Sequence, residues 1–429
     1  MTDLQSFEVR LHYGFPLHKL DRDALWIVER LTRSGHLAYL VGGCIRDLLS
    51  GLPPKDFDIA TSARPNQIKR LFRASRIIGR RFRLAHVWFG PKVIEVSTFR
   101  GMSQDSGGGG DEWGPIRDDN VFGAPEEDAM RRDFTINGLF YDVRSGEIID
   151  YVGGLTDLRR RSIRTIGDSE ARMIEDPVRM IRALKFAARF DFALEPALAS
   201  TIRTHHHHIE SSSPSRVLEE LFKILSSGAA SATIRLLAQY QLLDRLLPEI
   251  SRRLDRDGGQ AVYRYLDALD AADQGQRRHS NAVLLACLLV PLLDPLERRL
   301  AGLVPGERDS IADLALRTTR LVRGSALLRN LPRRDLYQLG QIMTLQRRLA
   351  QGEHAPAQRV VTQEEFGDTL ALFRIGSEAC DAGEELVSYW EQKALEFPIS
   401  LDRPAHDGWG REPSPWDPEP RSRRRRRRR

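Results

Sequence analysis

The sequence is poor in cysteine and has no long apolar run. Its three cysteines, Cys44, Cys287 and Cys380, are scattered and form no Cys-x-x-Cys pair, which argues against a disulfide framework or a cysteine zinc site and fits a reducing cytoplasm. The N-terminus lacks the basic region and apolar stretch of a signal peptide. The longest apolar stretch, residues 282–293, is too short to span a bilayer and contains Pro291, so it predicts a buried helix.

The two commonest phosphate-binding loops are also missing. No Gly-x-x-x-x-Gly-Lys-Ser/Thr motif occurs, and no Gly-x-Gly-x-x-Gly follows a strand pattern. The chain instead carries the run LVGGCIRD at residues 40–47, followed by KDFDI at residues 55–59. The paired glycines allow close approach of the backbone to a ligand, and Arg46 follows where a helix can begin. This arrangement predicts a loop that binds phosphate.

The second run places two carboxylates close together. Side chains alternate along an extended segment, so Asp56 and Asp58 share one face while Phe57 and Ile59 point to the buried side. Carboxylates with open water positions suit Mg²⁺, whose coordination is often completed by substrate phosphates. Either motif alone is usually a turn or a solvated strand end. Together, in this order, they indicate a nucleotide and metal site.

A third run, EEDAMRRDFTINGL at residues 126–139, completes the pattern. With the first two runs it resembles the class II tRNA nucleotidyltransferase and bacterial poly(A) polymerase family, whose members extend RNA 3′ ends without a template. The resemblance covers about residues 40–228 and includes YVGG at 151–154 and EDPVRMIR at 175–182. Within the family, IIGRRFRLAHV at 77–87, RDDNVFG at 117–123 and a basic C-terminal tail resemble the poly(A) polymerase branch. Two departures, Cys44 for a third glycine and Gly138 for alanine or serine, remove no charged group.

This resemblance implies an α+β fold, with a mixed β-sheet in a nucleotidyltransferase head and helical domains after it. Strand patterns before residue 100 and helical patterns from residue 168 agree with that division. The expected parts are an N-terminal extension (1–29), the head (30–165), a helical neck that binds RNA (166–235), a helical body (236–400) and a disordered arginine-rich tail (401–429).

The resemblance also implies the reaction and its residues. The 3′-hydroxyl of RNA attacks the α-phosphorus of ATP and pyrophosphate leaves, with Asp56 and Asp58 holding two Mg²⁺ ions. Asp133 is the expected third carboxylate, and Glu95 is the reserve. Glu95 shares a strand face with Ser97, opposite to Ile94 and Val96, so it can join the aspartates; the alternative is a solvated strand residue. The residues expected to bind the nucleotide are Gly42, Gly43, Arg46, Arg131, Arg132, Glu175, Asp176 and Arg179.

A helix predicted after Pro177 carries a cationic stripe of Arg179, Arg182, Phe186 and Arg189. An aromatic ring between arginines can stack a base while the guanidinium groups contact phosphate. The alternative is a solvated basic face on which Phe186 packs against a neighbouring helix. The histidine run 205–208 lacks acidic or cysteine partners at ligand spacing and predicts a solvated helix end. The glycine-rich stretch 102–119 predicts a mobile loop that covers the site.

The charge is distributed unevenly along the chain. The net charge is +6, but Arg421 and residues 423–429 supply eight arginines, which leaves −2 for the rest. Such a block buries no apolar surface, and it predicts a disordered arm for RNA or another polyanion, with a generic solubilising tail as the alternative. Two other functions stay open. A CCA-adding enzyme shares this chemistry but stops after three nucleotides on tRNA, and a noncatalytic RNA-binding protein gives no reason for the paired aspartates.

Overall fold

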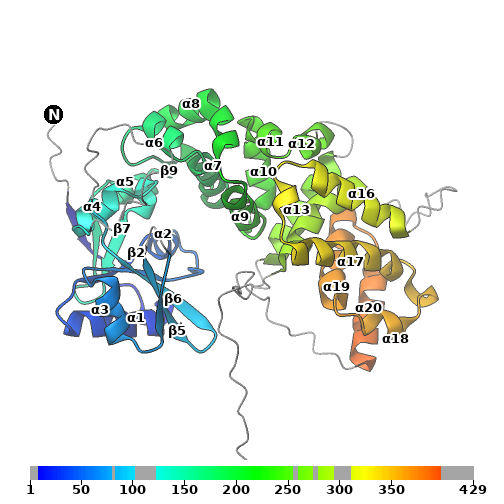
Figure 1. Cartoon of the computed structure of the whole chain (residues 1–429), viewed down its shortest axis with the longest axis horizontal. Coiled ribbons are helices and arrows are strands. Elements are labelled where there is room, and N and C mark those ends of the chain that lie inside the picture. Colours follow the sequence, from blue (N-terminus) through cyan, green and yellow to red (C-terminus); the bar gives the residue numbers. More distant parts are fainter. Residues whose placement is uncertain are drawn as a thin grey trace, which may run out of the picture. The chain divides into compact units, whose positions relative to one another are not determined.

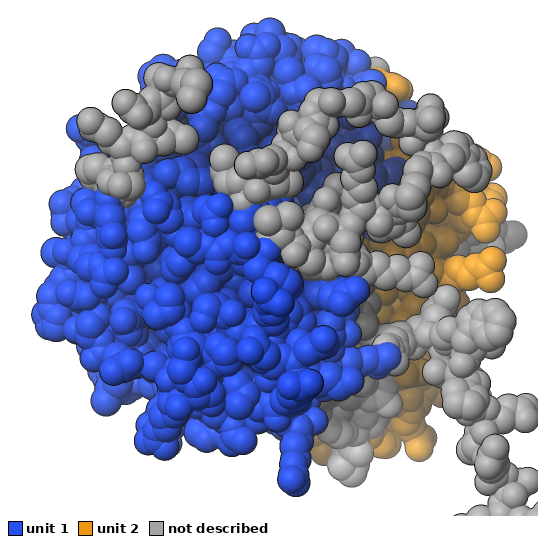
Figure 2. Space-filling view, turned by 60° about the vertical axis from the view of Figure 1, so that its left-hand side comes forward, with its two compact units in different colours: residues 1–220, 232–251 blue, residues 221–231, 252–429 orange. Residues whose placement is uncertain are grey.

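The computed structural model describes residues 8–79, 83–101, 122–254, 259–273, 279–293 and 311–397. The chain divides into two compact units, one made of residues 1–220 and 232–251 and the other of residues 221–231 and 252–429 (Figure 2). The predicted covering loop, 102–119, and the predicted tail, 401–429, both lie outside the described residues.

The head in the first unit is built on an eight-stranded mixed sheet with the order β1-β8-β7-β2-β3-β6-β5-β4 (Figure 1). Strand β3 pairs with β6 in parallel, and the other neighbours pair antiparallel. The strands are β1 Val9–His12, β2 Ala38–Val41, β3 Asp58–Thr61, β4 Ser75–Ile78, β5 Leu84–Phe89, β6 Lys92–Thr98, β7 Leu139–Asp142 and β8 Glu147–Asp150. The α+β prediction with a mixed sheet is confirmed.

The head begins earlier than the sequence predicted. Strand β1 pairs with β8 through Val9 and Asp150, and helix α1, Arg22–Arg33, packs its apolar residues into the sheet core. Residues 9–29 are therefore part of the head and not an extension. A four-residue edge strand that is only half buried carries too little periodicity to be recognised.

The two faces of the sheet are different environments. One face carries Leu40, Ile59 and Val96, and it is covered by α1 and by α3, Pro65–Leu71. Helix α1 offers this face the residues Ala24, Ile27, Val28 and Leu31, spaced as one helical stripe, and Asp21 caps its first turn. The opposite face carries Val41, Ala60 and Phe140 in a smaller core.

Short helices and a helical neck complete the first unit. They are α2 Gly43–Leu49, α4 Pro125–Met130, α5 Gly154–Arg159, α6 Ser169–Glu175, α7 Val178–Phe190, α8 Pro196–His205, α9 Pro214–Leu225, α10 Ala230–Gln239, α11 Leu242–Leu246 and α12 Pro248–Leu254, of which α9, α10 and α12 lie partly in the second unit. A two-stranded parallel pair, β9 Ser162–Ile163 and β10 Ala193–Leu194, joins the segment before α6 to the segment between α7 and α8. Pro177 precedes α7 as its cap.

The second unit is helical throughout its described residues. Its main helices are α13 Gly259–Asp273, α14 Asn281–Leu293, α16 Ile311–Gly324, α17 Arg333–Leu349, α18 Ala357–Val361, α19 Phe366–Cys380 and α20 Glu384–Glu396. Helix α14 is apolar all round and contains Pro291 near its end, and its residues are almost all buried, which confirms the predicted buried helix. Within the described ranges, no helix combines the length and apolarity that crossing a membrane requires.

Candidate active site

The glycine loop lies between β2 and α2. Strand β2 ends at Val41, Gly42 adopts φ 73°, and α2 begins at Gly43. A Cβ atom on Gly42 would stand 2.7 Å from Nη1 of Arg132, in addition to the strain that a side chain has at this φ. Glycine at this position thus lets the Arg132 guanidinium lie directly against the loop.

Three carboxylates gather beside this loop. Asp58 begins β3, Asp56 precedes it by two residues, and Glu95 lies on the neighbouring strand β6. The parallel register of Ile59 with Val96 places Asp58 and Glu95 on the same face of the sheet, away from the α1 and α3 core. Oε1 of Glu95 also lies 3.3 Å from Nε2 of His86, across the β5–β6 ladder.

The charge of this carboxylate cluster is poorly compensated. Asp58 is exposed as a residue at the start of β3, yet the pKa of its carboxylate is raised to about 6 from an ordinary 3.8. Surrounding protein atoms desolvate the carboxylate, and Glu95 and Asp56 add negative charge, while Arg132 opposes the rise. A bound cation would relieve this accumulation of negative charge.

Arg132 is the cation whose charge lowers the pKa of Asp58. Its side chain pairs with Asp128, Nη2 to Oδ2 3.1 Å, donates to the Asn137 carbonyl at 3.3 Å, and lies 5.3 Å from the ring centre of Phe140. Arg131 points elsewhere and donates to the Gly101 carbonyl. The structure therefore brings Arg132 to the glycine loop and the carboxylates but directs Arg131 to the chain before residue 102.

Asp133 belongs to a second cluster. Its carboxylate pairs with Arg182, Oδ2 to Nη2 2.8 Å, and accepts from the Asn137 amide at 2.9 Å and from the Phe134 N–H at 2.8 Å. Burial by itself raises the pKa of Asp133, but the positive charge of Arg182 and the hydrogen bonds from Asn137 and Phe134 outweigh burial and hold the pKa below its usual value. Asp133 is thus fixed by positive partners, and Glu95 is the carboxylate that lies with Asp56 and Asp58.

Arg46 joins the same second cluster and is almost completely buried. Its guanidinium donates to Asp47 at 2.6 and 2.9 Å and to the Asn137 amide oxygen at 2.5 Å. It also lies 4.6 Å and 4.8 Å from the ring centres of Phe186 and Phe190 on α7. Desolvation lowers the pKa of Arg46, although Asp47 opposes the change. In this structure Arg46 connects the glycine loop to α7, and its side chain is enclosed rather than directed at open solvent.

The cationic stripe of α7 faces the head. Arg182 pairs with Asp133, and Arg189 pairs with Asp47 at 2.8 Å. Phe186 is only 6% exposed and packs edge-on against Phe134. In this structure Phe186 presents no open face to a base, and Arg182 and Arg189 are paired with carboxylates of the head and do not form a solvated basic face. We call the residues Arg46, Asp47, Asp133, Asn137, Arg182 and Arg189 the clamp cluster.

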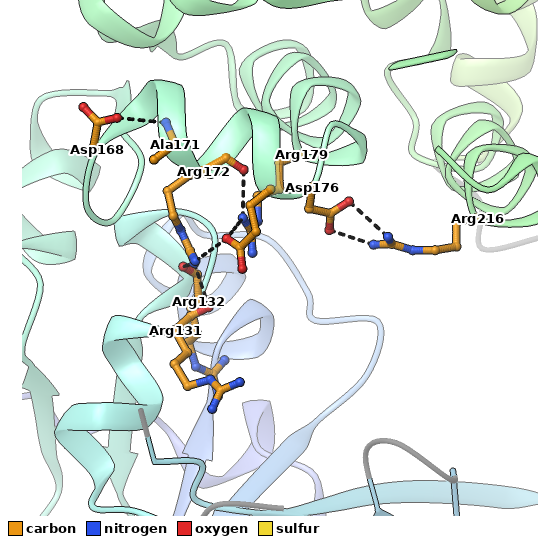
Figure 3. A network of polar contacts seen from close by, with 9 residues as sticks. Arg131, Arg132, Asp168, Ala171, Arg172, Asp176, Arg179 and Arg216 are labelled. Atoms are coloured by element: carbon orange, nitrogen blue, oxygen red, sulfur yellow. Dashed lines mark hydrogen bonds and ion pairs between the residues drawn. The ribbon is translucent and has the colours of Figure 1, made fainter. Parts of the chain in front are cut away.

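The Glu-Asp-Pro segment lies in a network of arginines between α6 and α9 (Figure 3). Glu175 accepts from Arg172 at 2.8 Å and from Arg179 at 2.6 Å, and Arg172 also donates to the carbonyls of Arg131 and Arg132. These arginines hold the pKa of Glu175 below its usual range although burial alone raises it. Asp176 accepts both arms of Arg216 at 3.0 and 2.7 Å, and this bond raises the pKa of Arg216.

Several polar partners were not expected from the sequence. Asn137 stands in the third run and its amide bridges Arg46 and Asp133, so the run itself was a usable signal. Asp47 likewise follows Arg46 in the first run. Arg216 lies 40 residues after Asp176 at the start of an amphipathic helix, and the sequence contains no pattern that joins the two.

The carboxylate cluster is a better candidate for binding a metal ion than the histidine run 205–208. His205 pairs with Glu170 at 3.2 Å, and the rings of His207 and His208 lie 4.3 Å apart. In the part of the chain that the structure describes, no three His, Cys, Asp or Glu side chains are already arranged to hold a metal ion. Aspartates 56 and 58 are hard oxygen donors with excess negative charge, which suits a cation that substrate phosphates and water help to coordinate.

Three family models match the chain. They are the poly A polymerase head domain over residues 38–164, the probable RNA and SrmB-binding site of polymerase A over residues 191–254, and the polymerase A arginine-rich C-terminus over residues 322–429.

Curated relatives give the same picture. Poly(A) polymerase I of Escherichia coli is 36% identical over 398 residues, which cover 88% of this chain and 83% of that protein. The enzyme of the same name from Salmonella typhi is 42% identical over 285 residues, and the aligned part spans 61% of its length. A CCA-adding enzyme of Geobacillus stearothermophilus is 35% identical over 244 residues, 57% of this chain and 59% of that protein.

Solved structures share the fold. A CCA-adding enzyme from Bacillus stearothermophilus in complex with CTP superposes with a TM-score of 0.57 at 28% identity, covering 88% of this chain and 83% of that one. A tRNA-processing enzyme without ligand superposes with a TM-score of 0.56 at 20% identity, covering 90% and 94%.

Proposed function

The chain belongs to the bacterial poly(A) polymerase branch of the tRNA nucleotidyltransferase and poly(A) polymerase family, and from this premise we propose that it adds AMP from ATP to RNA 3′ ends and releases pyrophosphate. The observation that carries the proposal is the carboxylate cluster of Asp56, Asp58 and Glu95 beside the Gly42 loop and Arg132. Accumulated negative charge next to a phosphate-binding loop suits metal-assisted phosphoryl transfer.

Asp56 and Asp58 would hold Mg²⁺, and Glu95 is our choice for the third active-site carboxylate in place of Asp133. When bound, Mg²⁺ would neutralise the triphosphate and lower the pKa of the attacking hydroxyl. Glu95 shares the sheet face with Asp58, and a carboxylate there can accept the proton that the RNA 3′-hydroxyl loses. Asp133 is already occupied by Arg182 and Asn137 and cannot take that role without breaking both contacts.

The triphosphate would lie against Gly42, Gly43 and Arg132. The loop offers a close backbone approach, and the Arg132 guanidinium, which already lies against Gly42, has the charge to contact phosphate oxygens. Arg46 contributes indirectly, because it holds α2 through Asp47 and Asn137.

The base would lie near Glu175, Asp176 and Arg179. Arg172 and Arg179 share Glu175, while Arg216 holds both oxygens of Asp176. A site whose polar groups are held in fixed directions favours one hydrogen-bonding pattern and therefore one base. We propose that this base is adenine, since a relative that aligns over 88% of this chain is a poly(A) polymerase.

The test is incubation of the purified protein with Mg²⁺, a labelled RNA and each nucleoside triphosphate in turn. We expect repeated addition with ATP and little with CTP, GTP or UTP. CCA-adding enzymes among the relatives make CCA addition the second candidate. An ordered C, C, A product that stops on tRNA would establish it and refute the ATP preference.

The arginine-rich tail, residues 401–429, would contact the RNA substrate. Truncation after Pro420 removes all eight of its last arginines. Because each phosphate contact contributes about −0.7 to the logarithmic salt slope of single-strand binding, truncation should flatten that slope by several units. An unchanged slope would assign the tail to another polyanion.

A further inference from the structure

One segment of the head is strongly basic without being part of the active site. Residues 59–94 contain nine lysine and arginine side chains and no aspartate or glutamate. Within it, Lys69 and Arg70 lie exposed on α3, whose Pro65 and Ile68 are buried, and Arg73 lies exposed just after that helix. None of these three cations makes an ion pair with any described residue.

The Trp26 ring on α1 packs beside Phe72, the residue that follows α3 and precedes Arg73. The Trp26 side chain is 44% exposed and packs edge-on against Phe72 and Phe89. The exposed Arg30 guanidinium lies 5.3 Å from the Trp26 ring centre and 5.8 Å from that of Phe72, the residue next to Arg73. We name the residues Trp26, Arg30, Lys69, Arg70 and Arg73 the α1–α3 surface.

The carboxylates at and just before α1 are already paired with cations outside the α1–α3 surface. Glu29 pairs with Arg33 at 2.6 Å, and Asp21 and Asp23 both pair with Lys92. The remaining positive charge on the α1–α3 surface is thus available to a polyanion.

We infer that the α1–α3 surface binds single-stranded RNA at a distance from its 3′ end. Lys69, Arg70 and Arg73 would contact phosphates, and a base would stack on the exposed part of Trp26 or on the Arg30 plane. Base stacking on an aromatic ring tolerates any sequence, which fits a substrate that is recognised by its end. Helices α1 and α3 cover the sheet face opposite to Asp58 and Glu95, so this surface and the active site are separate. The inference rests on the proposed function only in that RNA is the substrate.

The test compares two full-length triple variants by RNA binding without ATP, so that it does not depend on catalysis. The first variant is Lys69→Glu, Arg70→Glu and Arg73→Glu. The matched control is Arg329→Glu, Arg333→Glu and Arg334→Glu, which makes the same change in charge at exposed arginines of the second unit that also lack ion pairs with described residues. The affinity of each variant is measured for single-stranded RNA of about 6 and about 40 nucleotides; the first length lies near the lower end of typical single-strand site sizes and the second lies well above them.

We expect the first variant to bind the longer RNA about tenfold more weakly, with a salt slope flatter by about 2 for the three lost phosphate contacts. The short RNA and the control variant should change less than twofold. Equal weakening in both variants, or unchanged binding in the first, would overturn the inference.

Trp26→Leu gives an independent measurement that leaves the charge unchanged. Loss of one stacked base should weaken binding of the longer RNA about tenfold without altering the salt slope. Circular dichroism melting of each variant verifies that it is folded, and a glutamine version of the triple variant replaces the glutamate version if the latter melts early. Wild-type affinity in a folded Trp26→Leu variant would remove the stacking part of the inference.

Discussion

The carboxylate cluster and the clamp cluster lie in the same head but differ in how their charges are compensated. Around Asp58, like charges gather, and the pKa of Asp58 rises to about 6 because of desolvation and the nearby Glu95. Around Asp133 the charges alternate, and Arg182 and Asn137 overcome burial and keep its pKa low. A protein that keeps negative charges together without compensation leaves the balancing charge to a ligand. Paired, buried charges need no ligand and fix the elements that carry them.

The largest effect should follow removal of a metal-binding carboxylate. Asp58→Asn and Asp56→Asn should each lower AMP addition at least about a thousandfold, because several kcal/mol of transition-state stabilisation by the metal is lost. RNA affinity and the thermal midpoint should not fall, since less repulsion remains. Asp142→Asn, the same substitution at the end of β7, is the control and should keep wild-type activity. Near-normal activity in both variants would refute the metal assignment.

The sequence predicts that Asp56 and Asp58 lie on one face, because side chains alternate along a strand and this rule needs only local sequence. The sheet, the helical second half and the buried helix around Pro291 followed from local patterns in the same way. Strand β1 was missed because four half-buried residues carry a weak signal.

The sequence could not predict which side chains contact one another across the fold. Arg46 was expected at the nucleotide and Phe186 at a base, yet they stack on each other. Asp133 was expected beside Asp58, whereas the structure gives it to Arg182. The sequence names the charged groups, but tertiary packing decides which of them are paired with one another.

The next largest effect concerns the stability that the clamp cluster gives to the head. Arg46→Met should lower the free energy of unfolding by about 3 kcal/mol, because Asp47 loses one of its two partners in a buried site. Arg33→Met, which removes only an exposed pair with Glu29, should change it by less than about 0.5 kcal/mol. Urea titration followed by circular dichroism measures both. Equal, small effects would mean that Arg46 is not structurally required.

A direct contrast of Glu95 with Asp133 separates catalysis from positioning. Glu95→Gln should lower kcat about a hundredfold with little change in stability, as expected for loss of a proton-accepting carboxylate. Asp133→Asn should lower the free energy of unfolding by about 2 kcal/mol, since it removes the charge that pairs with Arg182 and weakens the hydrogen bond that the Asn137 amide donates. If instead Asp133→Asn abolishes turnover at full stability while Glu95→Gln is active, Asp133 is the third carboxylate.

The smallest effects concern pH and should have opposite signs in the two clusters. The folded pKa of Asp58 is about 6 and its ordinary value is 3.8, so its charge opposes folding above pH 6 and this penalty disappears as pH falls toward 3.8. Asp133 has a lowered folded pKa, so its stabilisation is complete above its ordinary value and is lost only in stronger acid. The thermal midpoint of Asp58→Asn should therefore exceed that of the wild type at pH 7.5 by more than at pH 5, measured without Mg²⁺. The deficit of Asp133→Asn should be equal at these two pH values and shrink below about pH 4. An Asp58→Asn midpoint that follows the wild type at both pH values would show that the carboxylate cluster carries no excess charge, and the contrast between the clusters would fail.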